Sequence, residues 1–158
     1  MRNFALALLA LLPAACSKED AAPAPPPPPA AARPERLANG EPAVVTVKHV
    51  LVAFAGSERS RATRTKAEAE KLAYDVLARA KGGEDFDHLM KQHSDDPGGG
   101  TYTMTNAGIP PSGEEMSRAD MVRAFGDVGF RIEVGELGFA FHDTASSPFG
   151  FHVIKRVK

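Results

Sequence analysis

Two histidines stand inside two apolar segments that lie far apart along the chain. Residues 44–54 are rich in valine and carry His49, and residues 147–158 are rich in phenylalanine, valine and isoleucine and carry His152. β-branched and aromatic residues favour strands, in which alternate side chains share a face. We therefore expect two strands with one imidazole each. If the strands are neighbours in register, the imidazoles meet on one face.

These histidines have a plain structural interpretation as well as a chemical one. Taken singly, each is explained as a core histidine whose hydrogen bonds are satisfied by its surroundings. Taken together they indicate more, because a neutral imidazole carries one donor and one acceptor and two imidazoles can satisfy each other. Mutual hydrogen bonding is therefore one way in which the chain can bury both rings.

The pattern around the histidines resembles the parvulin family of peptidyl-prolyl cis/trans isomerases. The resemblance rests on the histidine pair, on the closing strand at 149–154 and on a Ser-Asp-Asp turn at 94–96. It covers about residues 45–157, with the motifs in the expected order. It implies an α+β, parvulin-like fold of the FKBP-like superfold, with an antiparallel sheet of about four strands flanked by about four helices.

The resemblance also implies roles for individual residues. His49, His152 and Asp96 would form the polar, catalytic part of the site. Asp96 precedes Pro97, and an Asp-Pro turn explains this local sequence equally well. The histidine pair and the family pattern together make the three residues a candidate cluster.

An apolar pocket for the substrate proline is implied by the same resemblance. Met121 and Phe125 would form its floor and wall, with Tyr102 and Phe149 as further wall residues. Tyr102 takes the place of a leucine in the family pattern, within a segment, residues 98–118, that departs from that pattern. For Met121 and Phe125 the alternative is ordinary core packing.

A polar loop with three arginines, residues 55–64, follows the first predicted strand. In some relatives the corresponding loop gathers basic residues that bind a phosphate before the proline. Here Ala53 and Glu58 stand at two of the expected basic positions, and only Arg59 matches. Because a phosphate site needs several converging donors, a solvated loop is favoured. We therefore expect no requirement for phosphoserine or phosphothreonine.

The remaining segments predict three helices and one further strand, which precedes the closing strand. A capping box at 65–68 opens a helix that ends at the glycines 82 and 83, and residues 84–90 predict a shorter helix. Residues 119–130 predict a third helix, and residues 135–141 a turn and strand. The order strand, helix, short helix, helix, strand, strand suits an α+β domain.

Composition excludes several function classes. The formal net charge of −1 provides no basic excess for nucleic acid. His88 and His93 are expected to face solvent, and their spacing supplies no further metal ligands. No serine nucleophile beside a base and no phosphate-cradling loop is found. We expect neither a cofactor nor a metal.

The first residues predict export rather than a folded element. Residues 1–16 combine Arg2, a short apolar run and small residues before Cys16, the only cysteine of the chain. This resembles the lipobox of bacterial lipoproteins, although Pro13 replaces the usual leucine. Ser17 resembles lipoproteins sent to an outer membrane, so that the domain would face the periplasm of a bacterial cell envelope. The alternative is an ordinary cleaved signal peptide followed by an incidental cysteine.

Residues 17–43 predict a linker, and residues 44–158 the parvulin-type domain. The linker is rich in alanine and proline and favours polyproline II, which buries too little apolar surface to fold. It is interpreted as a spacer between a lipid and the domain. A ligand for an SH3-like groove is the alternative.

The function implied is isomerisation of X-Pro bonds in unfolded or exported polypeptides. The barrier to rotation, about 18–20 kcal/mol, arises from amide resonance. A site lowers it by holding proline in an apolar pocket and stabilising the twisted amide. The alternative is a chaperone-like binding module of the same fold with little or no turnover, which the altered segment 98–118 keeps open.

Overall fold

The computed structural model describes residues 33–158. The predicted signal peptide, Cys16 and most of the predicted linker therefore lie outside the described residues. Within the described part, no helix combines the length and the apolar character that crossing a membrane would require.

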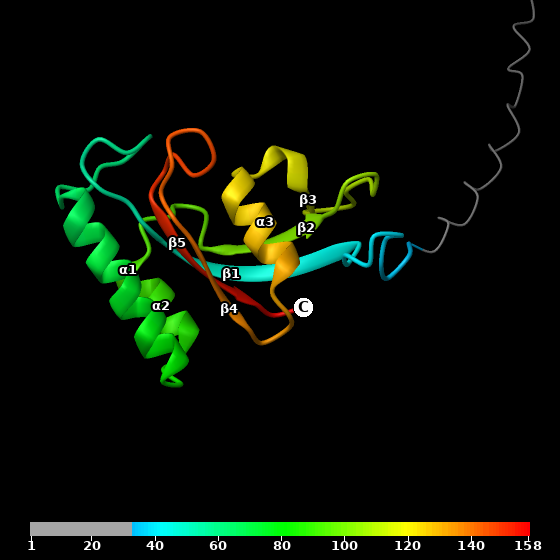
Figure 1. Cartoon of the computed structure of the whole chain (residues 1–158), viewed down its shortest axis with the longest axis horizontal. Helices are drawn as coiled ribbons and strands as arrows, with labels where there is room; N and C mark the ends of the chain where they lie inside the picture. Colours follow the sequence, from blue (N-terminus) through cyan, green and yellow to red (C-terminus); the bar gives the residue numbers. More distant parts are fainter. Residues whose placement is uncertain (1–32) are drawn as a thin grey trace, which may run out of the picture. The chain divides into compact units, whose positions relative to one another are not determined.

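A five-stranded sheet forms the centre of the domain (Figure 1), in the order β3-β2-β1-β5-β4. Its strands are β1 (Val44–Val52), β2 (Thr101–Thr105), β3 (Met116–Ser117), β4 (Leu137–Ala140) and β5 (Phe151–Arg156). All pairs are antiparallel except β2 with β3. The predicted α+β class is confirmed, and β2 and the short β3 are the strands that the sequence patterns did not predict.

Helices cover both faces of this sheet. Apolar residues of α1 (Lys66–Lys81) and α2 (Phe86–His93) form one core with Val50, Val52 and Val153. Residues of α3 (Arg123–Arg131) form the second core with Val45, Val47 and Ile154. Because side chains alternate along β1 and β5, His49 and His152 lie on the α3 face.

The predicted helices are present with corrected boundaries. Thr65 caps α1, and the capping box with Glu68 is formed. The third helix is shorter than predicted, because a 3₁₀ turn, η1 (Arg118–Asp120), precedes it and Met121 between them has an extended backbone. His93 does not face solvent freely: it is half-buried, and its Nε2 lies 2.9 Å from a guanidinium nitrogen of Arg79.

Candidate active site

The register of β1 against β5 brings the two histidines together. His49 lies opposite Ile154, and His152 lies opposite Leu51, so the imidazoles are diagonal neighbours on one face. Their Nδ1 atoms are 3.1 Å apart, and their rings are stacked with centroids 5.2 Å apart. His49 is only 4% exposed and His152 only 3%. The expected meeting of the two imidazoles is thus present in the fold.

A loop takes the place of a strand beside the second half of β1. The backbone N–H of Leu51 donates to Ser94 Oγ at 3.1 Å, and Leu51 O accepts from Asp95 N at 2.8 Å. Ala53 N donates to Asp95 Oδ2 at 2.9 Å. These bonds hold residues 94–96 against the strand that carries His49. The Ser-Asp-Asp turn therefore positions the next carboxylate, that of Asp96.

The carboxylate of Asp96 accepts three hydrogen bonds. Oδ2 lies 2.9 Å from His49 Nε2 and 2.8 Å from Tyr102 Oη, and Oδ1 accepts from Gly98 N at 3.0 Å. Burial by itself would raise the pKa of Asp96. The hydrogen bonds from His49, Gly98 and Tyr102 outweigh burial and hold this pKa well below its usual range. Asp96 is therefore a charged acceptor in the folded protein.

The charged acceptor sets the direction of the hydrogen bonds through both imidazoles. Because an ionised carboxylate only accepts, His49 Nε2 carries a proton, and in the tautomer with that single proton Nδ1 of His49 is an acceptor. With His49 in this tautomer, His152 Nδ1 is the donor in the 3.1 Å contact. Burial, and then the neighbouring His49, lower the pKa of His152 to about 3, which keeps that ring neutral. Its Nε2 is buried and has no hydrogen-bond partner among the described residues.

Phe125 supplies the apolar side of this polar chain. Its ring is 2% exposed and meets the His49 ring edge-on at a centroid distance of 4.8 Å. It also lies 5.6 Å from the His152 ring and 6.0 Å from the Tyr102 ring. Of the four predicted pocket residues, Phe125 and Tyr102 thus touch the polar cluster directly.

Met121 and Phe149 lie at two different hollows. Met121 is half-buried, packs against the same core cluster as Phe125 and lines a hollow of about 370 Å³. Phe149 lines a larger cavity of about 720 Å³, of which Asp96 forms another wall. The predicted pocket residues therefore do not share one cavity, and only Phe125 and Tyr102 lie against His49.

The arginine loop, residues 55–64, borders the larger cavity, and two of its arginines contact neighbouring residues. Arg64 forms an ion pair with Asp95 and donates to the carbonyl oxygen of Ala53 at 2.8 Å. Arg59 has its guanidinium 5.7 Å from the centre of the Phe149 ring. Its φ of 56° lies in the left-handed region, which non-glycine residues seldom adopt. Most residues of 55–64 are exposed, in keeping with a solvated loop, and Ser57 is its one buried residue.

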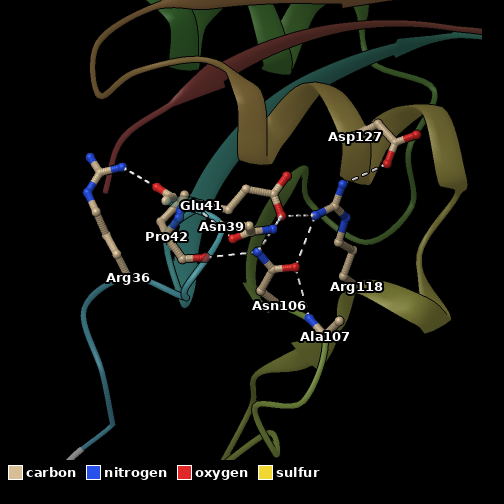
Figure 2. Close-up of polar contacts among 9 residues, drawn as sticks. Arg36, Asn39, Glu41, Pro42, Asn106, Ala107, Arg118 and Asp127 are labelled. Atoms are coloured by element: carbon tan, nitrogen blue, oxygen red, sulfur yellow. Dashed lines mark hydrogen bonds and ion pairs between the residues drawn. The ribbon is translucent and has the colours of Figure 1, made fainter.

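A polar network behind α3 was not found from the sequence (Figure 2). Arg118 donates to Asn106 Oδ1 at 3.0 Å, and its other terminal nitrogen donates to Asp127 at 2.8 Å. Glu41 Oε2 accepts from both Arg118 and Asn106, each at 3.1 Å. The network joins the segment before β1 to η1 and α3, which carry the candidate pocket residues. No local pattern signals it, because its members come from four separate segments.

Comparison with known proteins decides the family. A family model described as the PPIC-type PPIASE domain matches residues 36–158. The chain belongs to the PpiC-type peptidyl-prolyl isomerase family. The resemblance to parvulins inferred from the histidine pair and the Ser-Asp-Asp turn is confirmed. The matched range begins before β1 and includes Glu41 of the polar network.

Individual relatives of this PpiC-type chain are foldases and chaperones by name. It is 34% identical to Foldase protein PrsA 4 of Bacillus cereus over 90 residues, which are 54% of this chain and 27% of that protein. It is 33% identical to Chaperone SurA of Chromohalobacter salexigens over 113 residues, which are 69% of this chain and 21% of that protein. The chain spans less than a third of the length of these two relatives.

A solved structure shares the fold. The Peptidyl-prolyl isomerase ESS1 from Candida albicans superposes with a TM-score of 0.60 at 22% identity, covering 76% of this chain and 69% of that one. At 22% identity this comparison shows that the two proteins share a fold. That fold is the parvulin-like fold expected from the sequence. No cluster of histidine, cysteine, aspartate or glutamate suited to a metal ion occurs within residues 33–158.

Proposed function

We propose that this protein catalyses cis/trans isomerisation of X-Pro bonds in polypeptides, without a cofactor. The observation that carries the proposal is the hydrogen-bonded chain of His152, His49 and Asp96, which contacts the buried ring of Phe125 and reaches the wall of the 720 Å³ cavity. Membership of the PpiC-type family supports the same reaction.

The proposed mechanism is non-covalent. Rotation about the X-Pro bond must overcome about 18–20 kcal/mol of amide resonance. An apolar wall such as Phe125 favours the twisted amide, which is less conjugated and less polar than the planar one. The hydrogen-bonded series of His152, His49 and the charged Asp96 supplies a fixed electrostatic field beside the X-Pro bond. His49 and His152 hold the Asp96 carboxylate, and therefore this field, in place. None of the three residues is assigned as a nucleophile.

The proposed substrates are unfolded or exported polypeptides. The names of the relatives, a foldase and a chaperone, support polypeptide substrates. The sequence of residues 1–16 supports export, with a lipid on Cys16 and the domain facing the periplasm. The linker, residues 17–43, would then separate the domain from the membrane.

The test is an exchange assay on the full chain. Peptides with different residues before proline are followed by NMR exchange spectroscopy or by a protease-coupled assay, with and without protein. We expect acceleration for at least some of the peptides, unchanged by a metal chelator. Absence of acceleration for every peptide would contradict the proposal.

A chaperone-like binding module with little turnover is the second candidate. One surface favours it: the rings of Tyr74, Phe139 and Phe141 form a cluster in which Tyr74 is 46% and Phe141 55% exposed. Tyr74 belongs to α1, Phe139 to β4, and Phe141 directly follows β4; Phe139 packs against the core on the sheet face opposite the histidine pair. Exposed aromatic clusters mark sites of interaction with other chains.

Two sets of variants separate the candidates. Met121→Ala with Phe125→Leu alters the proposed proline pocket, and Tyr74→Ser with Phe141→Ser alters the exposed cluster. If isomerisation is the function, only the first pair lowers the exchange rate. If binding is the function, only the second pair weakens suppression of aggregation of an unfolded client. Circular dichroism of each variant checks that the fold is retained, because Phe125 is buried.

A further inference from the structure

The hydroxyl of Tyr102 is part of the polar end of the candidate site. Tyr102 Oη donates to Asp96 Oδ2 at 2.8 Å, the same oxygen that lies 2.9 Å from His49 Nε2. The ring of Tyr102 lies 5.6 Å from the ring of His49. A wall residue of the proline pocket needs only an apolar surface, and the family pattern has a leucine here. The hydrogen bond of this hydroxyl to Asp96 is therefore not explained by the role of a wall.

The loop before β2 is shaped to admit this hydroxyl. A Cβ atom on Gly98 would lie 2.3 Å from Tyr102 Oη and 3.3 Å from Asp96 Oδ1. The φ angle of Gly98 is not in the left-handed region, so the lack of a side chain matters for space rather than for backbone freedom. Gly98 also donates its N–H to Asp96 Oδ1 at 3.0 Å. The close approach of Tyr102 to Asp96 depends on a glycine at this position.

The shared oxygen couples Tyr102 to the histidine pair. Two donors on one carboxylate oxygen fix its position and favour its charged form. Burial, together with the neighbouring Asp96, raises the pKa of Tyr102 to about 12, so the phenol remains a donor at neutral pH. A carboxylate that only accepts keeps the proton of His49 on Nε2. The direction of the bond between His49 and His152 follows from that proton.

We propose that Tyr102 is a positioning residue, whose hydroxyl holds the Asp96 carboxylate so that the His49–His152 pair keeps one hydrogen-bond direction. Its influence on isomerisation rests on the proposed function. Its influence on the imidazole tautomers does not, because the hydrogen bonds exist in the free protein.

The first experiment removes only the hydroxyl. Tyr102→Phe in the full chain keeps the ring that lines the pocket and takes away one donor from Asp96. We expect kcat to fall roughly tenfold, the size of one hydrogen bond to a charged group, with KM changed less than about twofold. In the wild type we expect ¹⁵N NMR shifts of the imidazole nitrogens that correspond to Nε2–H on His49 and Nδ1–H on His152. In Tyr102→Phe these shifts should move away from that pattern. Thr103→Val, which removes a hydroxyl of the same strand that is bonded to Thr46 Oγ1 at 3.0 Å, should leave all three readouts unchanged.

The second experiment displaces the hydroxyl without changing the tyrosine. Gly98→Ala places a methyl group where Tyr102 Oη lies, so it should reproduce the loss of kcat and the shifted imidazole signals. Added to Tyr102→Phe, it should cost little more, because both changes break the same bond. Full additivity of the two changes in kcat would overturn the proposal.

The outcomes distinguish the positioning role from the proposed function. If KM rises while kcat and the imidazole signals stay constant in Tyr102→Phe, Tyr102 is only a wall and the positioning role is wrong. If the wild-type chain shows no isomerisation, the proposed function fails. The imidazole spectra of Tyr102→Phe and Gly98→Ala then still decide whether Tyr102 orients the pair, and unchanged spectra would overturn the positioning role.

Discussion

His49 and His152 are hydrogen-bonded across a diagonal of the sheet. Their Nδ1 atoms are 3.1 Å apart although the residues are separated by 103 positions and each lies opposite an aliphatic residue of the other strand. Both rings are almost fully buried. Each histidine therefore depends on the other for a hydrogen bond that water cannot replace.

The first prediction is that the two histidines are energetically coupled. His49→Leu or His152→Leu alone leaves a buried polar atom without its partner, which should lower the free energy of unfolding by about 1–3 kcal/mol. The double variant should cost less than the sum of the two, because no unpaired imidazole remains. Urea unfolding of the four proteins measures the coupling, and additivity within about 0.5 kcal/mol would contradict it.

The second prediction concerns acid stability. The pKa of His152 is lowered from 6.5 to about 3 by burial and then by His49, so the folded state keeps this ring neutral while the unfolded state binds a proton. The stabilisation is complete above pH 6.5 and is lost as the pH falls toward 3, by up to about 1.4 kcal/mol per pH unit. The pKa of Asp96 is also lowered from its ordinary value of 3.8. This carboxylate therefore adds a further loss of stability only when the pH falls below 3.8.

Variants at two histidines check this slope. The free energy of unfolding of His152→Gln should depend less steeply on pH between 6.5 and 3 than that of the wild type. His88→Gln is the control, since His88 is exposed and lies on α2 away from the pair. An equal slope in His152→Gln and in the wild type would show that His152 is not the titrating group.

The third prediction is that a phosphate before proline is not required. Ala53 and Glu58 supply no positive charge to the larger cavity, and Arg64 is already paired with Asp95. Arg59 and Arg61 alone do not form a converging phosphate site. Exchange rates for Ser-Pro and phosphoserine-Pro peptides should therefore differ by less than about tenfold. A larger preference for the phosphopeptide would show that the arginine loop binds the phosphate.

The fourth prediction is that residues before β1 stabilise the domain. Glu41 accepts hydrogen bonds from Arg118 and Asn106, and the carbonyl oxygen of Pro42 accepts a third bond from Asn106 at 3.0 Å. A chain of residues 44–158, the predicted domain, should have a lower free energy of unfolding than one of residues 33–158 by about 1–3 kcal/mol, because Asn106 is buried.

Single changes locate the cause of that difference. Glu41→Gln should reproduce part of the loss, since it weakens the bond from Arg118 while keeping the shape of the side chain. Glu35→Gln is a matched control, because within residues 33–158 only the backbone oxygen of Glu35 accepts a hydrogen bond, from Ala43 N. Equal stability of the two chain lengths would show that the segment before β1 is not needed for folding.

The fifth prediction is that Cys16 carries lipid. Several acyl chains are needed for stable membrane attachment, and a lipobox cysteine would receive them. Cells expressing the wild type should incorporate a fatty-acid probe into the protein, and cells expressing Cys16→Ser should not. A wild type that takes no label and fractionates as a soluble periplasmic protein would contradict the lipobox, without bearing on the domain after residue 43.

The sequence by itself was sufficient for the family, the fold class and the meeting of His49 and His152. β-branched and aromatic residues in two separate segments predicted β1 and β5, because such side chains suit a half-buried pleated surface. The capping box at Thr65 likewise predicted the start of α1, since capping depends on residues three apart. Such local rules act over a few residues and can be read directly from the chain.

The tertiary structure decided which atoms of the candidate site touch. The bond from Tyr102 to Asp96 needs β2 beside β1 and a glycine at position 98, and the Arg118 network needs four segments to converge. Met121 was predicted on a helix but lies between η1 and α3, because contacts of Arg118 with Asp127 and Glu41 shape this turn. Hydrogen-bond partners far apart in sequence are chosen by the packing of whole elements, and no local pattern of residues carries that information.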